Sequence, residues 1–246
     1  MDEARIKVGL IVPSSNTTVE WDFQRLMPKH VSLHSARMWL TGSGAEGLPR
    51  MNEDMEVAAS HLGSAAVDLI VYACTGGSLL EGPGHDTRIS ARITELTGIP
   101  ATTISTASRQ AMTTLDMHKL VVCCPYQDSM TEKVGAYLNA SGYEVVSLSG
   151  RRKEDNLAIG NDPLDEIVDF VADNTVAEAD GIFLSCTNWR TTDVCQRIED
   201  RTGKPVVTAN QATAWATRHL LGFNDPVAGY GCLMQQPPAA AALATE

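Results

Sequence analysis

The sequence predicts an α/β protein built from two pseudo-symmetric, Rossmann-like halves, each a mostly parallel sheet flanked by helices. The first observation is an internal repeat. Cys74 and Cys186 each end an apolar segment, are followed by threonine, and lie 61 residues after a proline, Pro13 or Pro125. The second is a Thr-Gly-x-Pro sequence further along the chain from each cysteine. One structural unit used twice places the two cysteines opposite each other across a pseudo-two-fold axis.

The third observation is that short apolar runs alternate with longer amphipathic stretches, as in a parallel sheet covered by helices. Several of the runs are rich in valine and isoleucine and apolar throughout, as expected for strands buried on both faces. The predicted strands are Lys7–Val12, Val31–Met38, Leu69–Ala73, Ala101–Ile104, Lys119–Cys124, Glu144–Leu148, Gly181–Ser185 and Pro205–Thr208. The predicted helices are Thr18–Met27, Asn52–Ala66, Thr87–Leu96, Thr106–Leu115, Ser129–Ala140, Pro163–Asn174, Thr191–Arg201 and Ala212–Leu221.

The repeat divides the chain near residue 117. Residues 1–117 form the expected first half and 118–209 the second, and residues 210–234 are expected to pack back on the first half. Arg151–Asn161 is polar without an apolar period, and we predict a loop near the site. Glycines in Gly42–Gly47 suggest a lid. The low-complexity tail, 235–246, is predicted to be mobile.

The bulk composition excludes several classes of protein. The 246 residues carry a formal net charge of −11 and show no basic patch, which argues against nucleic acid or an anionic membrane as a partner. No apolar run is long enough to cross a membrane, and the amino terminus has no signal-peptide pattern, so we expect a cytoplasmic protein. The six cysteines are then expected to remain thiols. Their spacing does not match a zinc site, and no metal is expected.

The motifs that could carry chemistry follow predicted strands, whose carboxyl ends form the ligand-binding edge of an open α/β sheet. Cys74 leads into Thr75, Gly76 and Gly77, whose backbone N–H groups can face an anion. The same donors are expected to lower the pKa of the thiol and favour the nucleophilic thiolate. Cys186, followed by Thr187 and Asn188, has the same features, and we predict a functional role for both cysteines.

Other polar residues are expected to contact a ligand. Ser15 and Asn16 lie in a turn that can cap a helix and also present an amide to a carboxylate. Tyr126 occupies the matching loop of the second half, and Asn156 lies in the polar loop.

These motifs resemble the aspartate/glutamate racemase superfamily, and within it the maleate cis-trans isomerase branch. The similarity rests on Val12–Glu20, Ser35–Met38, Ala73–Ser78 and Leu184–Asn188, and spans roughly Lys7 to Leu233. The Asp-Ser-Gly and Cys-Asn-Thr motifs of glutamate racemases are absent. Arylmalonate decarboxylases keep only the second cysteine. The sequence Gly229–Leu233 nevertheless resembles the carboxyl-terminal sequence of that group. Ectoine-utilisation proteins share almost all the motifs.

The resemblance implies a cofactor-independent isomerase that converts maleate to fumarate. In that family pattern Cys74 is the nucleophile and Cys186 the acid/base partner, while Asn16, Tyr126 and Asn156 hold the two carboxylates of a small dicarboxylate. By analogy with the superfamily, we expect a homodimer or homotetramer.

Two other functions remain open on the sequence. The first is a racemase or decarboxylase that uses the paired cysteines on another carbon acid, or an ectoine-pathway protein of unknown substrate. The second is a non-catalytic sensor that binds a small dicarboxylate without turnover.

Overall fold

The computed structural model describes residues 5–40, 48–79 and 81–238 and contains two parallel four-stranded sheets, one in each half of the chain. The first has the order β2-β1-β3-β4, with β1 Ile6–Pro13, β2 Val31–Met38, β3 Leu69–Tyr72 and β4 Ala101–Thr103. The second has the order β6-β5-β7-β8, with β5 Lys119–Cys124, β6 Glu144–Gly150, β7 Gly181–Leu184 and β8 Val206–Thr208. The same strand order in both halves confirms the predicted fold class.

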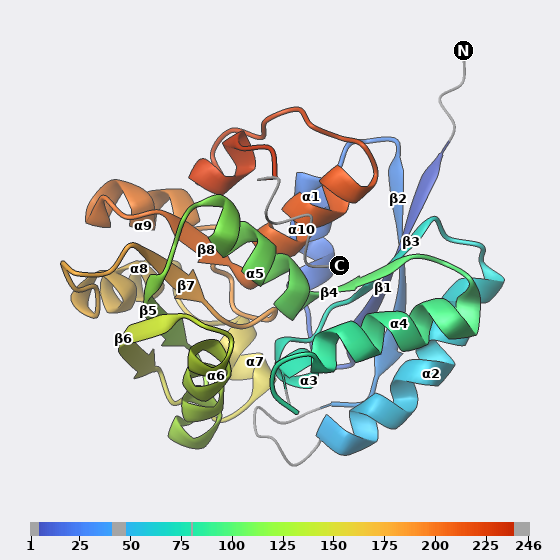
Figure 1. The fold of residues 1–246 in the computed structure, drawn as a ribbon, viewed down its shortest axis with the longest axis horizontal. Coiled ribbons are helices and arrows are strands. Elements are labelled where there is room, and N and C mark those ends of the chain that lie inside the picture. The colour runs from blue at the N-terminus through green and yellow to red at the C-terminus, as the bar shows by residue number, and fades with distance from the viewer. Residues whose placement is uncertain (1–4, 41–47, 80, 239–246) are drawn as a thin grey trace.

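Helices cover both sheets, and Figure 1 shows them around two groups of strands that lie side by side. The first half contains α1 Val19–Leu26, α2 Leu48–Ser64, α3 Thr75–Leu79, α4 His85–Thr97 and α5 Ile104–Thr114. The rest of the chain contains α6 Asp128–Ala140, α7 Asn156–Gly160, α8 Leu164–Asp173, α9 Cys195–Thr202, α10 Ala209–Leu220 and the short 3-10 helix η2 Cys232–Gln235.

The repeat is visible in equivalent hydrogen bonds. In the first half the Asp68 carboxylate accepts from the N–H of Lys7 (2.7 Å), and the N–H of Asp68 donates to the Lys7 carbonyl (2.8 Å). In the second half Asp180 makes the same two bonds with Lys119, over 2.7 and 2.8 Å. Each pair fixes the start of a central strand against its neighbour, which gives the two sheets the same register.

The repeat also includes a helix pair that the sequence comparison did not connect. Thr103 accepts a hydrogen bond from the N–H of Thr106 and begins α5, while Thr208 accepts one from the N–H of Gln211 and begins α10. Each threonine cap lies before the residues whose apolar spacing predicts the helix. Both helices therefore begin two or three residues before the predicted positions. The helices α5 and α10 pack against each other between the two sheets (Figure 1), and α10 also contacts α1.

The apolar core joins the halves. One cluster runs from β1 and β3 through α1, α5 and α10 into both faces of the second sheet. A second cluster lies on the other face of the first sheet, where Ile11, Ile70 and Tyr72 pack under α2 and α4. Alternate side chains of β1 and β3 therefore belong to different clusters, as expected for strands buried on both faces.

Two short elements differ from the predictions. The sequence predicts a loop over Arg151–Asn161, whereas its last part forms the helical turn α7, which Asp155 caps by accepting from the N–H of Ala158 at 2.7 Å. The glycine-rich segment after Cys74 forms the buried helix α3. Both are too short to show a helical apolar period, so periodicity could not identify them. The predicted lid Gly42–Gly47 lies outside the described residues, as does the tail from residue 239 onward.

Candidate functional site

The two cysteines follow equivalent strands. Cys74 lies two residues after the end of β3 and Cys186 two residues after β7, and each is only 4% exposed. The two sulfurs are near enough to interact, since the charge of Cys186 acts to raise the pKa of the Cys74 thiol. The loops that follow β1 and β5 reach the same end of the sheets, so four strand ends from both halves contribute to it.

Backbone donors surround the Cys74 sulfur. The N–H of Gly77 in α3 donates to Sγ over 3.4 Å, and a hydrogen bond from the backbone N–H of Gly76 also favours the thiolate. Burial is nevertheless the larger effect and raises the pKa of the Cys74 thiol to about 12. The expectation that the donors lower this pKa is therefore wrong for the net direction, because they offset only part of the desolvation.

Cys186 has a side-chain donor as well. The N–H of Asn188 reaches its Sγ over 3.4 Å, and the Tyr126 hydroxyl donates a hydrogen bond to the same sulfur. Burial still raises the pKa of Cys186, while these bonds act in the opposite direction. Burial also raises the pKa of Tyr126 well above its ordinary value, and the charges of Cys186 and Cys74 add to the increase. Tyr126 therefore remains a neutral donor to the Cys186 sulfur.

Asn16 connects the first loop to the second half. Its Oδ1 accepts from the N–H groups of Thr18 (2.9 Å) and Val19 (3.1 Å), which fixes the turn that leads into α1. Its Nδ2 donates to Thr187 Oγ1 over 3.0 Å. The residue is 2% exposed, so its side chain is fixed by bonds in both directions.

Asn188 connects three segments. Its Oδ1 accepts from the N–H of Thr17 (2.9 Å), and its Nδ2 donates to the carbonyl of Asn156 (2.6 Å) in α7. A Cβ at Gly160 would lie 3.3 Å from this amide and 3.3 Å from Thr17 Oγ1, so the glycine allows α7 to approach closely. The Oδ1 of Asn188 therefore joins the two halves, while its Nδ2 holds α7 within the second half, so both polar atoms of this predicted ligand-binding side chain have protein partners.

Asn156 and Ser15 meet at the edge of the site. Asn156 Nδ2 donates to Ser15 Oγ over 2.8 Å, and Ser15 Oγ donates to the carbonyl of Leu40. The structure therefore brings together residues of both halves that the sequence predicted for the site. Thr75 is buried as well, and its hydroxyl has no hydrogen-bond partner among the described residues.

Sequence reasoning missed a buried support behind Thr187. Asn210, at the start of α10, donates through Nδ2 to the Thr187 carbonyl and to the Asp22 carboxylate, each over 2.8 Å. Asp22 also pairs with Arg25 at 2.7 Å, and burial raises the pKa of Asp22. A second support lies behind α3, where the hydroxyls of Ser78 and Ser105 are 2.7 Å apart. These contacts cross between distant elements and leave no pattern in the sequence.

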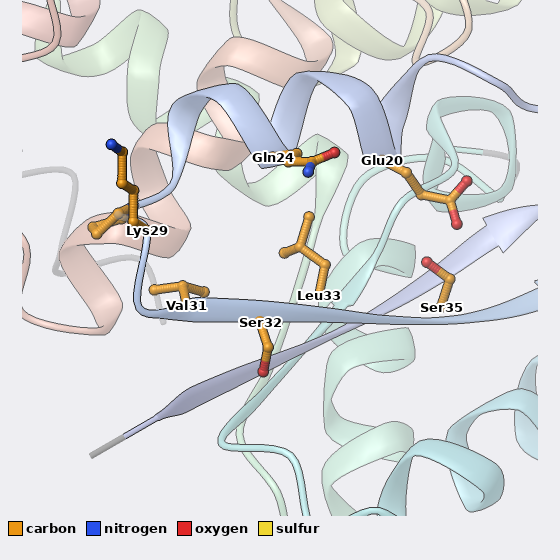
Figure 2. Close-up of a pocket in the computed structure, with 8 residues that line it drawn as sticks. Glu20, Gln24, Lys29, Val31, Ser32, Leu33 and Ser35 are labelled. Atoms are coloured by element: carbon orange, nitrogen blue, oxygen red, sulfur yellow. The ribbon is translucent and has the colours of Figure 1, made fainter. Parts of the chain in front are cut away.

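Other surfaces are separate from this site. An open groove of about 510 Å³ lies between α1 and β2 (Figure 2). It is lined by Glu20, Gln24, Pro28, Lys29, Val31, Ser32, Leu33 and Ser35. Across the described ranges there is no cluster of three metal-ligating side chains. Within the same ranges no helix is long and apolar enough to cross a membrane.

Comparisons with known proteins agree with this architecture. The family model described as arylmalonate decarboxylase matches residues 8–234. The chain is 30% identical to a maleate isomerase of Geobacillus stearothermophilus over 93% of this chain and 96% of the relative. It also resembles the structure of Pseudomonas putida S16 maleate isomerase, a cysteine-to-alanine variant with maleate, with a TM-score of 0.89 and 28% identity over 93% of this chain and 97% of that one.

A second solved structure carries chemical information about a relative. A cysteine-to-serine variant of Nocardia farcinica maleate cis-trans isomerase contains a covalently bound succinylcysteine intermediate. It is similar to this chain with a TM-score of 0.90 and 28% identity over 94% of this chain and 99% of that one. The chain therefore belongs to the Asp/Glu racemase-like arylmalonate decarboxylase family, and it is an enzyme of the group that maleate isomerases and arylmalonate decarboxylase form.

Proposed function

We propose that this protein isomerises maleate to fumarate without a cofactor. The observation that carries the proposal is the pair of interacting, buried cysteines, each at the end of an equivalent strand and each facing backbone donors. The similarity to maleate isomerases, one with a succinylcysteine intermediate, supports the same chemistry.

In the proposed reaction the thiolate of Cys74 adds to one olefinic carbon of maleate. The π electrons move to the other carbon and its carboxylate, and that carbon takes a proton from the thiol of Cys186. The former double bond is now single and rotates. The Cys186 thiolate then removes the proton, the double bond re-forms, the C–S bond breaks, and fumarate leaves with the Cys74 thiolate regenerated. A positioned proton donor of this kind contributes about 10²–10⁴ in rate.

Neutral donors would hold the substrate. We assign the two carboxylates to Asn16, Tyr126 and Asn156, with Ser15 as a neighbour. The backbone N–H groups of Thr75, Gly76 and Gly77, together with Thr187 and Asn188, would stabilise charge that develops near the sulfurs. Fixed dipoles in a buried site need no reorganisation as charge forms, which supports catalysis without a cationic side chain. No cofactor or metal takes part in this scheme.

The test is proton NMR of maleate incubated with the purified, reduced protein. We expect the fumarate singlet to appear, and we expect kcat/KM to rise with pH because burial holds the free Cys74 thiol neutral at pH 7. A maleate signal that stays unchanged both at pH 7 and at higher pH would contradict the proposal.

A second candidate reaction is decarboxylation of an arylmalonate, which the family model favours. Racemisation of an amino acid belongs to the same class, since two opposed thiols can remove and return a proton. Release of CO₂ from phenylmalonate would indicate the first, and solvent deuterium at an α-carbon would indicate the second. A non-catalytic sensor would bind maleate without any of these products, and its affinity would survive Cys→Ser changes.

We also propose that the protein is a homodimer or homotetramer, by analogy with the superfamily. Exposed Trp21 and Trp39, 58% and 60% exposed, provide apolar surface that a contact between copies could cover. Light scattering of the purified protein tests this, and a monomer at micromolar concentration would contradict it.

A further inference from the structure

The segment Ser35–Met38 carries an arginine whose role the proposed reaction does not use. Arg37 is the penultimate residue of β2 and pairs in register with Val12 of β1. Figure 2 shows Val31, Leu33 and Ser35 of β2 on the face turned toward α1. Because alternate residues of a strand share a face, Arg37 continues this row toward the loop that follows β1.

The guanidinium of Arg37 contacts three carbonyl groups of that loop. Its Nη1 donates to the carbonyl oxygens of Asn16 at 2.8 Å, Ser14 at 3.2 Å and Pro13 at 3.4 Å. Its Nη2 pairs with the carboxylate of Glu20 in the first turn of α1. One side chain therefore joins the end of β1, the loop and the start of α1.

The loop needs such a cation because several backbone carbonyls point to one place. Carbonyl dipoles gathered in this way repel one another unless a donor lies between them, and the planar fork of arginine can serve several acceptors at once. Arg37 is 40% exposed, so an ordinary ion pair with Glu20 would contribute little to stability. Its contacts fix instead the backbone that carries Ser15 and Asn16.

We propose that Arg37 is the positioning residue of the Pro13–Asn16 loop, and that Glu20 fixes the orientation of its guanidinium. Arg37 does not touch the substrate. It holds the carbonyl of Asn16, so that the amide of this residue keeps its direction toward Thr187 and the site. The effect on substrate binding rests on the proposed function, whereas the effect on the loop does not.

Hydrogen exchange of the free protein tests the effect on the loop. The N–H groups of Asn16, Thr17, Thr18 and Val19 all donate hydrogen bonds within or from this segment. In Arg37→Ala we expect these amides to exchange at least about tenfold faster, with a smaller increase in Arg37→Lys and Glu20→Gln. The matched control is Arg92→Ala, since Arg92 is also 40% exposed and pairs with Glu56 and Glu95 away from the loop.

Kinetics with maleate supply the second measurement. We expect Arg37→Ala to raise KM about tenfold with a smaller change in kcat, to show the same Tm as Arg92→Ala, and to recover partly in Arg37→Lys. Unchanged exchange in Arg37→Ala, or equal acceleration in Arg92→Ala, would overturn the proposal. Faster loop exchange in a protein whose wild type leaves maleate unchanged would overturn the proposed function and retain the positioning role.

Discussion

The two cysteine turns hold similar sulfurs by different means. After Cys74 the chain enters a helix at once, and the N–H groups of Gly76 and Gly77 point back at Sγ. After Cys186 the chain runs through Thr187 and Asn188 without a helix until Cys195, and the sulfur gains the Tyr126 hydroxyl. Both sulfurs face backbone N–H groups, but only Cys186 also accepts from a side-chain hydroxyl, and a hydroxyl beside a thiol is suited to proton exchange. The difference supports the assignment of addition to Cys74 and proton transfer to Cys186.

The largest expected effect comes from removing the nucleophile. Cys74→Ser should lower kcat for maleate by about 10³-fold or more, because a serine hydroxyl does not ionise in the pH range in which a cysteine thiol does. Cys186→Ser should also be slow but should accumulate a covalent adduct on Cys74, detectable by intact-protein mass spectrometry after incubation with maleate. The control is Cys232→Ser, a partly buried cysteine outside the site. An adduct on Cys186 in Cys74→Ser would reverse the two roles.

The next effect concerns a buried aspartate that each half contains. Asp162 pairs with Arg151 and Lys153 at 2.7 and 2.8 Å and accepts from Trp189 Nε1, whereas Asp86 pairs with Arg109 at 2.8 Å. Removing one member of a buried ion pair costs about 3–5 kcal/mol. We expect Asp162→Ala to fall in this range, measured by urea unfolding.

Asp86→Ala is the matched variant in the first half and should cost less. Only Oδ2 of Asp86 has partners, while its Oδ1 is buried with none among the described residues. Equal losses in the two variants would show that the extra donors around Asp162 add nothing.

A smaller effect is expected for the side chain that distinguishes the second turn. Tyr126→Phe removes the hydrogen bond to Cys186 and should lower kcat about tenfold, which corresponds to about 1.4 kcal/mol. That bond lowers the pKa of Cys186. In the variant, iodoacetamide should therefore alkylate Cys186 only at a higher pH than in the wild type. Cys74 alkylation, followed by peptide mass spectrometry in the same sample, serves as the internal control. An unshifted Cys186 profile would contradict the assignment of the bond.

The smallest effect concerns stability at high pH. Burial raises the pKa of Cys74 from 9.0 to about 12, so this thiol stays protonated in the folded state while it ionises in the unfolded chain. Its contribution to stability is therefore complete below pH 9 and is lost as pH rises toward 12. Between pH 8 and pH 10 the free energy of unfolding should therefore decrease by about 1 kcal/mol less in Cys74→Ala than in the wild type, measured by urea unfolding at each pH. A fall as steep in Cys74→Ala as in wild type would show that this thiol is not held neutral.

The sequence was a good guide where its signal was local. The strands Val31–Met38 and Lys119–Cys124 have the predicted bounds. For the second strand the signal is an apolar run that ends at Pro125. The repeat predicted that both cysteines reach one site. The helices after Cys74 and in Arg151–Asn161 were missed because single turns have no period.

The net rise in the pKa of Cys74 could not be predicted either, since it depends on how much of the fold covers the sulfur. The bonds from Asn210 to Thr187 and from Arg37 to the first loop join residues that only the folded chain brings together.

The apolar cluster that runs through α5 and α10 into both sheets has an evolutionary consequence. A shorter ancestor with one sheet would have exposed the surface that these two helices now share, and pairing with an identical copy is the simplest way to cover it. Its reactive centre would then have lain on the symmetry axis, with the same cysteine contributed twice. A single chain that carries both sheets is free of that constraint, and its two cysteine turns do differ, with glycines after Cys74 and the Tyr126 hydroxyl at Cys186.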